Sequence, residues 1–212
     1  FTQGISLNPS SALAHSQYAM YLATMGRVQD ALTEVRRAQE LDALSPIVNS
    51  DLGWYLFYAG QPSDAIAQFR KTIEFDPNSV SAHRGLGIAL SQSGQHTSAI
   101  EELKKALAQS ENSPVVLGHL GAAYAAAKNR ADAEATIRSL AEMSTREYVP
   151  ASATAIIYAA LGNNAKALDW LDKAYEEHDF AITQVATAPW YASLRKEPRF
   201  LQLVGRLKLR VP

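Results

Sequence analysis

The residues best suited to bind a metal ion are five histidines, His15, His83, His96, His119 and His178. No two of them have the i, i+4 spacing of helical ligand pairs, the chain has no HExxH motif, and it contains no cysteine. His15 and His83 occupy equivalent places of a sequence repeat, but they are two repeats apart. We therefore predict no metal site, and we expect each histidine to have a structural or surface role.

Nucleophilic and acid–base catalysis also lack the residue spacings that they need. The segment Ser91-Gln92-Ser93-Gly94 lacks the first glycine of a Gly-x-Ser-x-Gly motif and falls at the end of a predicted helix. The pairs Glu101-Glu102 and Glu176-Glu177 are sequence neighbours on exposed helix surface rather than two carboxylates facing each other. No glycine-rich phosphate loop follows a strand, and no strand is predicted. The sequence predicts neither enzymatic activity nor a cofactor.

Positive charge is concentrated at the C-terminus, where the only acid is Glu197. One interpretation is a site for an anionic partner such as nucleic acid, and the other is the solvated face of a terminal helix. The second is favoured, because no aromatic residues alternate with the basic ones and the formal charge of the whole chain is −1. We expect no nucleic-acid binding. The basic residues are Arg195, Lys196, Arg199, Arg206, Lys208 and Arg210.

The elements that position all these residues follow a repeat of 34 residues, with units at 12–45, 46–79, 80–113, 114–147 and 148–179. Apolar residues recur at helical spacing twice within each unit, which predicts a helix pair. The eighth place is always small and the twentieth is always alanine. Because a mid-helix glycine costs about 1 kcal/mol relative to alanine, we expect these small residues to let helices approach closely. These residues are Ala19, Gly53, Gly87, Gly121 and Ala155 at the eighth place, and Ala31, Ala65, Ala99, Ala133 and Ala167 at the twentieth.

Turn residues separate the two helices of each unit. Gly26, Gly60, Gly94 and Gly162 fall where the first helix must end, and glycine adopts the left-handed conformation cheaply. The fourth unit has Lys128-Asn129 at this point, and we expect Asn129 to take the positive φ. A fixed period of this length predicts an all-α solenoid of stacked helix pairs.

The repeat resembles the tetratricopeptide repeat family over residues 1–179. The family signature of Leu-Gly, an aromatic, alanine, an aromatic, alanine and proline corresponds in the second unit to Leu52-Gly53, Leu56, Ala65, Phe69, Thr72 and Pro77. The usual tryptophan at place four is absent, and His15, Asn49, His83, Leu117 and Ala151 stand there. The resemblance implies a right-handed superhelix of stacked antiparallel helix pairs that serves protein interaction.

The period ends after His178, because a further repeat would put Pro189 in the middle of a helix. We expect a short helix at 180–187, a turn at 188–194 and a closing helix at 197–207, so that residues 180–212 cap the last repeat. This segment resembles the end of such arrays in larger bacterial multidomain regulators, which implies a parent protein of that kind. The residues that match are Pro189, Tyr191, Leu194-Arg195 and Pro198-Arg199-Phe200.

The N-terminal residues 1–11 read as the end of a preceding, incomplete repeat, because Phe1–Pro9 aligns with Phe69–Pro77. We therefore expect the natural polypeptide to extend further, so a leader before Phe1 would not be visible. No apolar run approaches the roughly 18 residues that a membrane span needs, and no membrane partner is expected. The expected location is cytoplasmic.

In the family, places two, five, nine, twelve and thirteen of the first helices line a concave groove. Carried over to this sequence, these places put the aromatic residues Trp54, Phe57 and Tyr58 beside Arg84. We expect Trp54 to be exposed there; the alternative is that Trp54 and Phe57 pack within their own layer. The family's carboxylate clamp for chaperone peptides needs several Lys, Asn and Arg, and only Arg84 is present. The resemblance implies a peptide-binding groove formed by Met20, Ser50, Trp54, Phe57, Tyr58, Arg84 and Ile88.

The predicted function is thus that of a non-catalytic scaffold that binds a protein or peptide partner in its groove. Two alternatives stay open. The chain could be a regulatory or accessory region of a larger enzyme or DNA-binding regulator, or a self-association module that forms homo-oligomers.

Overall fold

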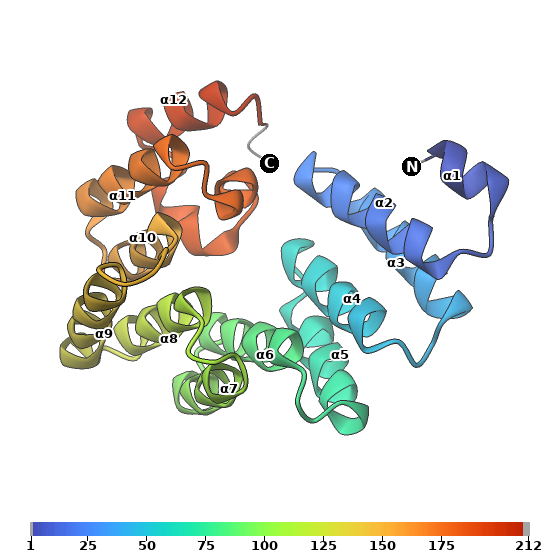
Figure 1. The fold of residues 1–212 in the computed structure, drawn as a ribbon, viewed down its shortest axis with the longest axis horizontal. Helices are drawn as coiled ribbons and strands as arrows, with labels where there is room; N and C mark the ends of the chain where they lie inside the picture. Colours follow the sequence, from blue (N-terminus) through green and yellow to red (C-terminus); the bar gives the residue numbers. More distant parts are fainter. Residues whose placement is uncertain (1, 210–212) are drawn as a thin grey trace.

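The computed structural model describes residues 2–209, and every regular element in that range is a helix (Figure 1). Helix α1 (Thr2–Leu7) precedes five antiparallel pairs, and η1 (Phe180–Gln184), η2 (Pro189–Leu194) and α12 (Pro198–Arg206) follow them. Together the pairs form a superhelical stack, as the all-α solenoid prediction requires. The pairs are α2 (Ala12–Thr24) with α3 (Val28–Leu41), α4 (Pro46–Tyr58) with α5 (Pro62–Phe75), α6 (Val80–Gln92) with α7 (His96–Gln109), α8 (Pro114–Ala126) with α9 (Arg130–Met143), and α10 (Ala151–Ala160) with α11 (Asn164–Glu176).

None of the helices in residues 2–209 is both long enough and apolar enough to span a membrane. The division of the chain into five repeats and a cap stays an interpretation of the sequence period.

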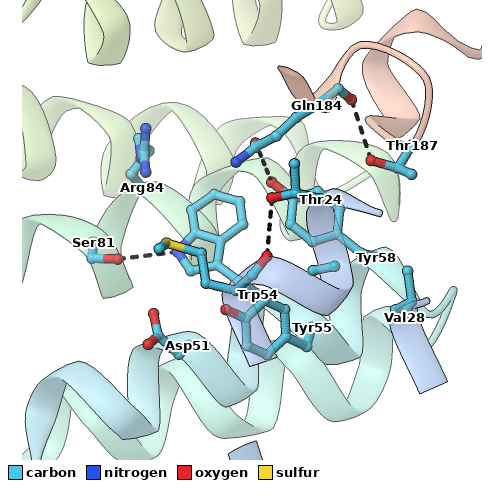
Figure 2. Close-up of a pocket in the computed structure, with 12 residues that line it drawn as sticks. Thr24, Val28, Asp51, Trp54, Tyr55, Tyr58, Ser81, Arg84, Gln184 and Thr187 are labelled. Atoms are coloured by element: carbon cyan, nitrogen blue, oxygen red, sulfur yellow. Dashed lines mark hydrogen bonds between the residues drawn. The ribbon is translucent and has the colours of Figure 1, made fainter. Parts of the chain in front are cut away.

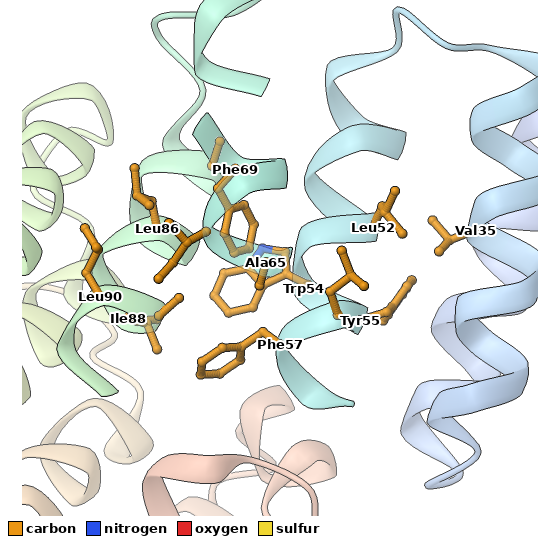
Figure 3. Close-up of a cluster of buried hydrophobic side chains, with 14 of the residues drawn as sticks. Val35, Leu52, Trp54, Tyr55, Phe57, Ala65, Phe69, Leu86, Ile88 and Leu90 are labelled. Carbon is orange, nitrogen blue, oxygen red and sulfur yellow. The ribbon is translucent and has the colours of Figure 1, made fainter. Parts of the chain in front are cut away.

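The small eighth place is confirmed as a packing requirement. A Cβ atom added to Gly53 would lie 2.5 Å from the Phe69 ring, and one added to Gly87 would lie 2.6 Å from the Leu103 side chain. Phe69 is fully buried between α4 and α6, where it also meets the edge of Trp54 (Figure 3). The second and third pairs therefore close only because glycine leaves this place without a side chain.

The turns within the pairs follow the prediction at four of five places. Gly26, Gly60, Gly94 and Gly162 have φ between +72° and +77°. The expectation for the fourth turn was wrong: Lys128 has a φ of +63°, whereas Asn129 has a φ of −85° and is the N-cap of α9. The Asn129 side chain accepts a hydrogen bond from the Asp132 backbone N–H, a role that lysine cannot fill. The repeat therefore keeps the left-handed residue at its usual place and uses the asparagine as a cap.

The fourth place of the first three units forms a repeated polar contact where the family has tryptophan. His83 Nδ1 lies 2.6 Å from Glu102 Oε2, and His83 Nε2 lies 3.0 Å from the Pro77 carbonyl oxygen. His15 repeats this arrangement with Glu34 and Pro9. In the unit between them, Asn49 bonds the Ala43 carbonyl and the Gln68 side chain.

These contacts join three segments, namely the loop before a pair and both of its helices. Both ring nitrogens of His83 lie within hydrogen-bond distance of an oxygen atom. Burial acts to raise the pKa of Glu102, but hydrogen bonds from Lys105 and His83 outweigh it and leave that pKa below its usual value. The absent tryptophan is thus replaced by hydrogen bonds without loss of the fold.

The fifth pair joins the stack differently from the others. Helices α4, α6 and α8 pack on the second helix of the preceding pair, whereas α10 packs chiefly on α8. A Cβ atom added to Gly118 would lie 2.7 Å from the Ala153 carbonyl oxygen, so this is a contact between two backbones. This close approach of α10 to α8 shifts the fifth pair toward the concave side of the stack. The segment after α11 then faces α2 across the interior of the curve (Figure 1).

Two of the helical glycines, Gly118 and Gly205, should respond in opposite ways to substitution by alanine. Gly118→Ala should lower the free energy of unfolding by about 1–3 kcal/mol, because its Cβ has no room beside the Ala153 backbone. Gly205→Ala should raise it by about 0.5–1 kcal/mol, because Gly205 has open space around it and alanine favours a helix. Urea unfolding of both variants measures this. Stabilisation by both substitutions would show that α8 and α10 are not in close contact.

Candidate binding site on the concave face

The segment from η1 to η2 enters the concave side of the stack. The Trp190 ring lies 5.0 Å from the His119 ring in an edge-to-face arrangement and 6.3 Å from the Tyr58 ring, measured between centroids. The Tyr58 hydroxyl donates a hydrogen bond to Gln184 Oε1 at 3.1 Å. These contacts join α4 to residues more than 120 positions away in the chain, so the C-terminal segment covers part of the groove that the sequence predicts.

Buried polar contacts hold this segment in place. Asp179 is buried, and its carboxylate accepts hydrogen bonds from the backbone N–H groups of Ser152 and Ala181 at 3.0 and 2.9 Å. The first of these lies in the opening turn of α10, where a carboxylate satisfies an otherwise unpaired N–H. Val185, Leu194 and the helix α12 add apolar burial against α10 and α11. The segment is therefore part of the folded core.

The basic C-terminal residues have more acidic partners than the sequence indicated. Arg199 pairs with Asp169 at 3.0 Å and with Asp172 at 2.7 Å, both on α11. Arg206 lies 3.9 Å from the centre of the Tyr175 ring and 3.8 Å from Asp172. The cluster therefore faces α11 acids as well as Glu197, while Arg210 lies outside the described residues. Two of the basic residues, Arg199 and Arg206, are thus paired with acids of the same chain.

A pocket of about 200 Å³ stays open on the concave face between α2, α4, α6 and the C-terminal segment (Figure 2). Helical spacing on α4 brings Asp51, Trp54 and Tyr58 to one side, and Ser81 and Arg84 face them from α6. The Trp54 indole N–H donates to Ser81 Oγ at 3.0 Å, which joins the two helices across the floor. The other lining residues are Met20, Ala23, Thr24, Val28, Tyr55, Gln184 and Thr187.

The residues predicted for the groove divide into two groups. Met20, Trp54, Tyr58 and Arg84 line this pocket, although Trp54 is only 8% exposed. The expectation of a well-exposed Trp54 therefore needs correction: its ring packs on Phe57 and Phe69 and offers the pocket one surface. The remaining three, Ser50, Phe57 and Ile88, are buried in the stack.

Arg84 and Asp51 are the charged groups of the pocket. The Arg84 guanidinium lies 4.9 Å from the Trp54 ring centre, and burial lowers its pKa. Burial raises the pKa of Asp51, which a hydrogen bond from the Ser16 hydroxyl at 2.8 Å opposes. Sequence analysis missed Asp51, because the groove pattern assigns no role to the sixth place of a unit. Its spacing of three residues from Trp54 was the available signal.

Proton transfer and metal binding find little support in this region. Burial first, and the Arg84 charge second, lower the pKa of His119 to about 3, so its imidazole is neutral at physiological pH. Within the described range, no three His, Asp or Glu side chains gather in a way that could hold a metal ion. What the pocket offers is an aromatic floor with two charges at its sides, which suits non-covalent recognition.

Comparison with models of known protein families identifies the family of this architecture. Models of the tetratricopeptide repeat match residues 50–114, 90–151 and 149–173, which together span more than half of the chain. The chain is a tetratricopeptide repeat protein. A search of curated proteins finds no match for this repeat protein.

Solved structures show the same fold. A thermophilic tetratricopeptide repeat protein of Thermus thermophilus is 21% identical with a TM-score of 0.67, over 94% of this chain and 100% of that one. PilW, described as a type IV pilus biogenesis factor, is 21% identical with a TM-score of 0.66, over 96% and 87%. YrrB, described as having an unusual peptide-binding site, is 22% identical with a TM-score of 0.52, over 87% and 96%. At these identities the likeness establishes the fold of the array.

The contacts of Trp190 predict its contribution to the stability of this repeat protein. Trp190→Ala should lower the free energy of unfolding by roughly 2 kcal/mol, less than the about 3–5 kcal/mol of a fully buried aromatic, because Trp190 is half-buried. It should also speed amide hydrogen exchange over residues 180–194. The control is Phe180→Ala in the same segment, which should change stability by less than about 0.5 kcal/mol because Phe180 is exposed. Equal effects of the two substitutions would show that Trp190 does not anchor the segment.

Proposed function

We propose that this array is a non-catalytic scaffold for protein interaction, and that a segment of a partner protein binds in the pocket between α2, α4 and α6. The observation that carries the proposal is the chemistry of this pocket. Beside Trp190 the half formed by α8 and α10 keeps a mostly apolar cavity of about 220 Å³, whereas the pocket lined by Met20, Trp54 and Arg84 combines an aromatic floor with charged side chains.

Exposed apolar side chains next to the pocket support this choice. Met20 is 52% exposed, and Leu13, two helical turns earlier on the same face of α2, is 66% exposed. Ile47 is 73% exposed and lies two turns before Trp54 on α4. Apolar side chains that gather beside a polar pocket are typical of an interaction surface. A peptide that fills the pocket would also cover these three side chains.

The fold agrees with the proposal at a general level. Tetratricopeptide repeats generally form scaffolds, and the structurally similar YrrB is described as having a peptide-binding site. We carry peptide binding over to this chain as part of the proposal. The site contains no nucleophile with a neighbouring base, which favours a scaffold over an enzyme.

Three wider expectations from the sequence belong to the same proposal. The array would serve a larger bacterial multidomain regulator, it would act in the cytoplasm, and it would bind neither nucleic acid nor a cofactor. The ion pairs of Arg199 and Arg206 favour protein over nucleic acid as the partner. Self-association through the exposed side chains of Leu13, Met20 and Ile47 is the second candidate function.

A pair of threonine-to-tryptophan variants tests the location of the site. Thr24 lines the pocket, whereas Thr33 lies on the exposed face of α3, and both hydroxyls bond a carbonyl four residues earlier. Peptides selected from a displayed library of random dodecamers should bind the original chain and Thr33→Trp equally. Thr24→Trp should weaken binding at least about tenfold, because the indole fills the pocket.

Fluorescence polarisation with the selected peptides measures these affinities, and melting temperatures confirm that both variants are folded. Equal affinity of Thr24→Trp and the original chain, or failure to select any binding peptide, would contradict the proposed site.

A further inference from the structure

The pocket contains two opposite charges that have no counter-ion in the described part of the chain. Arg84 has no hydrogen bond or ion pair with residues 2–209, and its guanidinium carbon lies 4.9 Å from the centre of the Trp54 ring. The Asp51 carboxylate accepts a hydrogen bond from the neutral Ser16 hydroxyl and pairs with no cation there. No ion pair joins Asp51 to Arg84, and in Figure 2 the two side chains lie on either side of Ser81.

This arrangement differs from that of the other arginines that the structure describes. All of those are exposed except Arg195, which donates a hydrogen bond to the Thr187 carbonyl. Arg84 is partly buried and receives no such compensation. Partial burial of an unpaired charge costs free energy, because the group loses water and gains no partner. The same holds for Asp51, and a single ligand in this pocket could compensate both.

The orientation of Arg84 leaves its hydrogen-bonding edge available. Its guanidinium carbon lies over the indole ring, and none of its N–H groups bonds a described residue, so these donors are available to bind a carboxylate through two parallel bonds. Tyr58 donates its hydroxyl hydrogen to Gln184 Oε1, which leaves the Gln184 amide N–H groups as further donors near Arg84. Asp51, one turn before Trp54 on α4, offers an acceptor on the Ser81 side.

We propose that this pocket selects a partner segment that carries an acidic and a basic side chain close together. The carboxylate of the segment binds Arg84, and its ammonium or guanidinium group binds Asp51, while apolar neighbours cover Met20 and Ile47. This inference rests on the proposed function and adds to it the chemistry of the ligand. A purely acidic segment would meet the Asp51 carboxylate, and a purely basic one would meet Arg84.

Octapeptides of fixed flanking sequence, blocked at both ends, provide the probe. They carry leucines at the flanks and one of four central pairs: Glu with Lys, Glu with Glu, Lys with Lys, or Gln with Gln. Both orders and spacings of one to four residues are included for the mixed pair. The best Glu–Lys peptide should bind at least about tenfold more tightly than its Gln–Gln counterpart. Because this comparison changes only the ligand, it does not depend on the folding of a variant.

Protein variants then assign each charge. Arg84→Gln should abolish the preference for Glu over Gln, and Asp51→Asn should abolish the preference for Lys over Gln. Arg70→Gln is the control, because Arg70 is an exposed arginine of α5, and it should leave both preferences unchanged. Equal binding of the mixed and the neutral peptides to the original chain would overturn the inference.

Failure of the charge inference is distinguishable from failure of the proposed site. If neutral peptides bind as well as charged ones and Thr24→Trp weakens them, the site stands and its proposed charge selectivity is wrong. If Thr24→Trp weakens none of the peptides that bind, or if none binds, both proposals are wrong.

Discussion

The backbone contact between Gly118 and Ala153 determines which part of the concave face the C-terminal segment covers. Because glycine leaves room for the Ala153 carbonyl, α10 packs on α8 instead of lying over α9. The fifth pair is thereby turned inward, and the segment that follows it crosses to α4. Part of the concave face becomes part of the hydrophobic core, and pockets remain on both sides of Trp190. A small residue at one helix crossing thus sets how much of the concave face stays open.

Most polar groups inside the stack have hydrogen-bond partners, although Ser50 Oγ, His96 Nδ1, Gln109 Oε1 and Arg195 Nε have none among the described residues. His15, Asn49 and His83 bind the loop before their pair, and Asp179 binds two backbone N–H groups. Asp51 and Arg84 differ from these groups because they are opposite charges that line one pocket without a counter-ion among the described residues. A buried or half-buried charge is tolerated where a functional partner supplies the missing interaction. This pair of charges is the physical basis of the proposed ligand chemistry.

The sequence predicted the features that repeat and also the three short helical elements after the last repeat, but it did not predict that the segment before α12 packs against the concave face. The period alone identified the helix pairs, the small eighth place and the four turn glycines, because each of these features recurs and serves the same packing or turn geometry. The burial of Trp54 was only the alternative expectation, and it results from packing on Phe69 of the same unit. The contact of Tyr58 with Gln184 was not predictable, because the C-terminal segment has no periodic signal. The fourth turn was mispredicted for another reason. The positive φ was assigned to Asn129 from the conformational preference of asparagine, whereas the register of the repeat places it at Lys128.

Thiol reactivity tests the uneven cover of the concave face most directly. Met20 and Ile156 occupy the same place of the first and fifth units, and the chain has no cysteine of its own. Met20 is exposed at the open pocket, whereas Ile156 is 4% exposed beneath Trp190. The account predicts that a maleimide reagent labels Met20→Cys at about the rate of an unfolded chain and labels Ile156→Cys at least about a hundredfold more slowly. Equal labelling rates in folded protein would contradict it, because the C-terminal segment would then leave the whole concave face open.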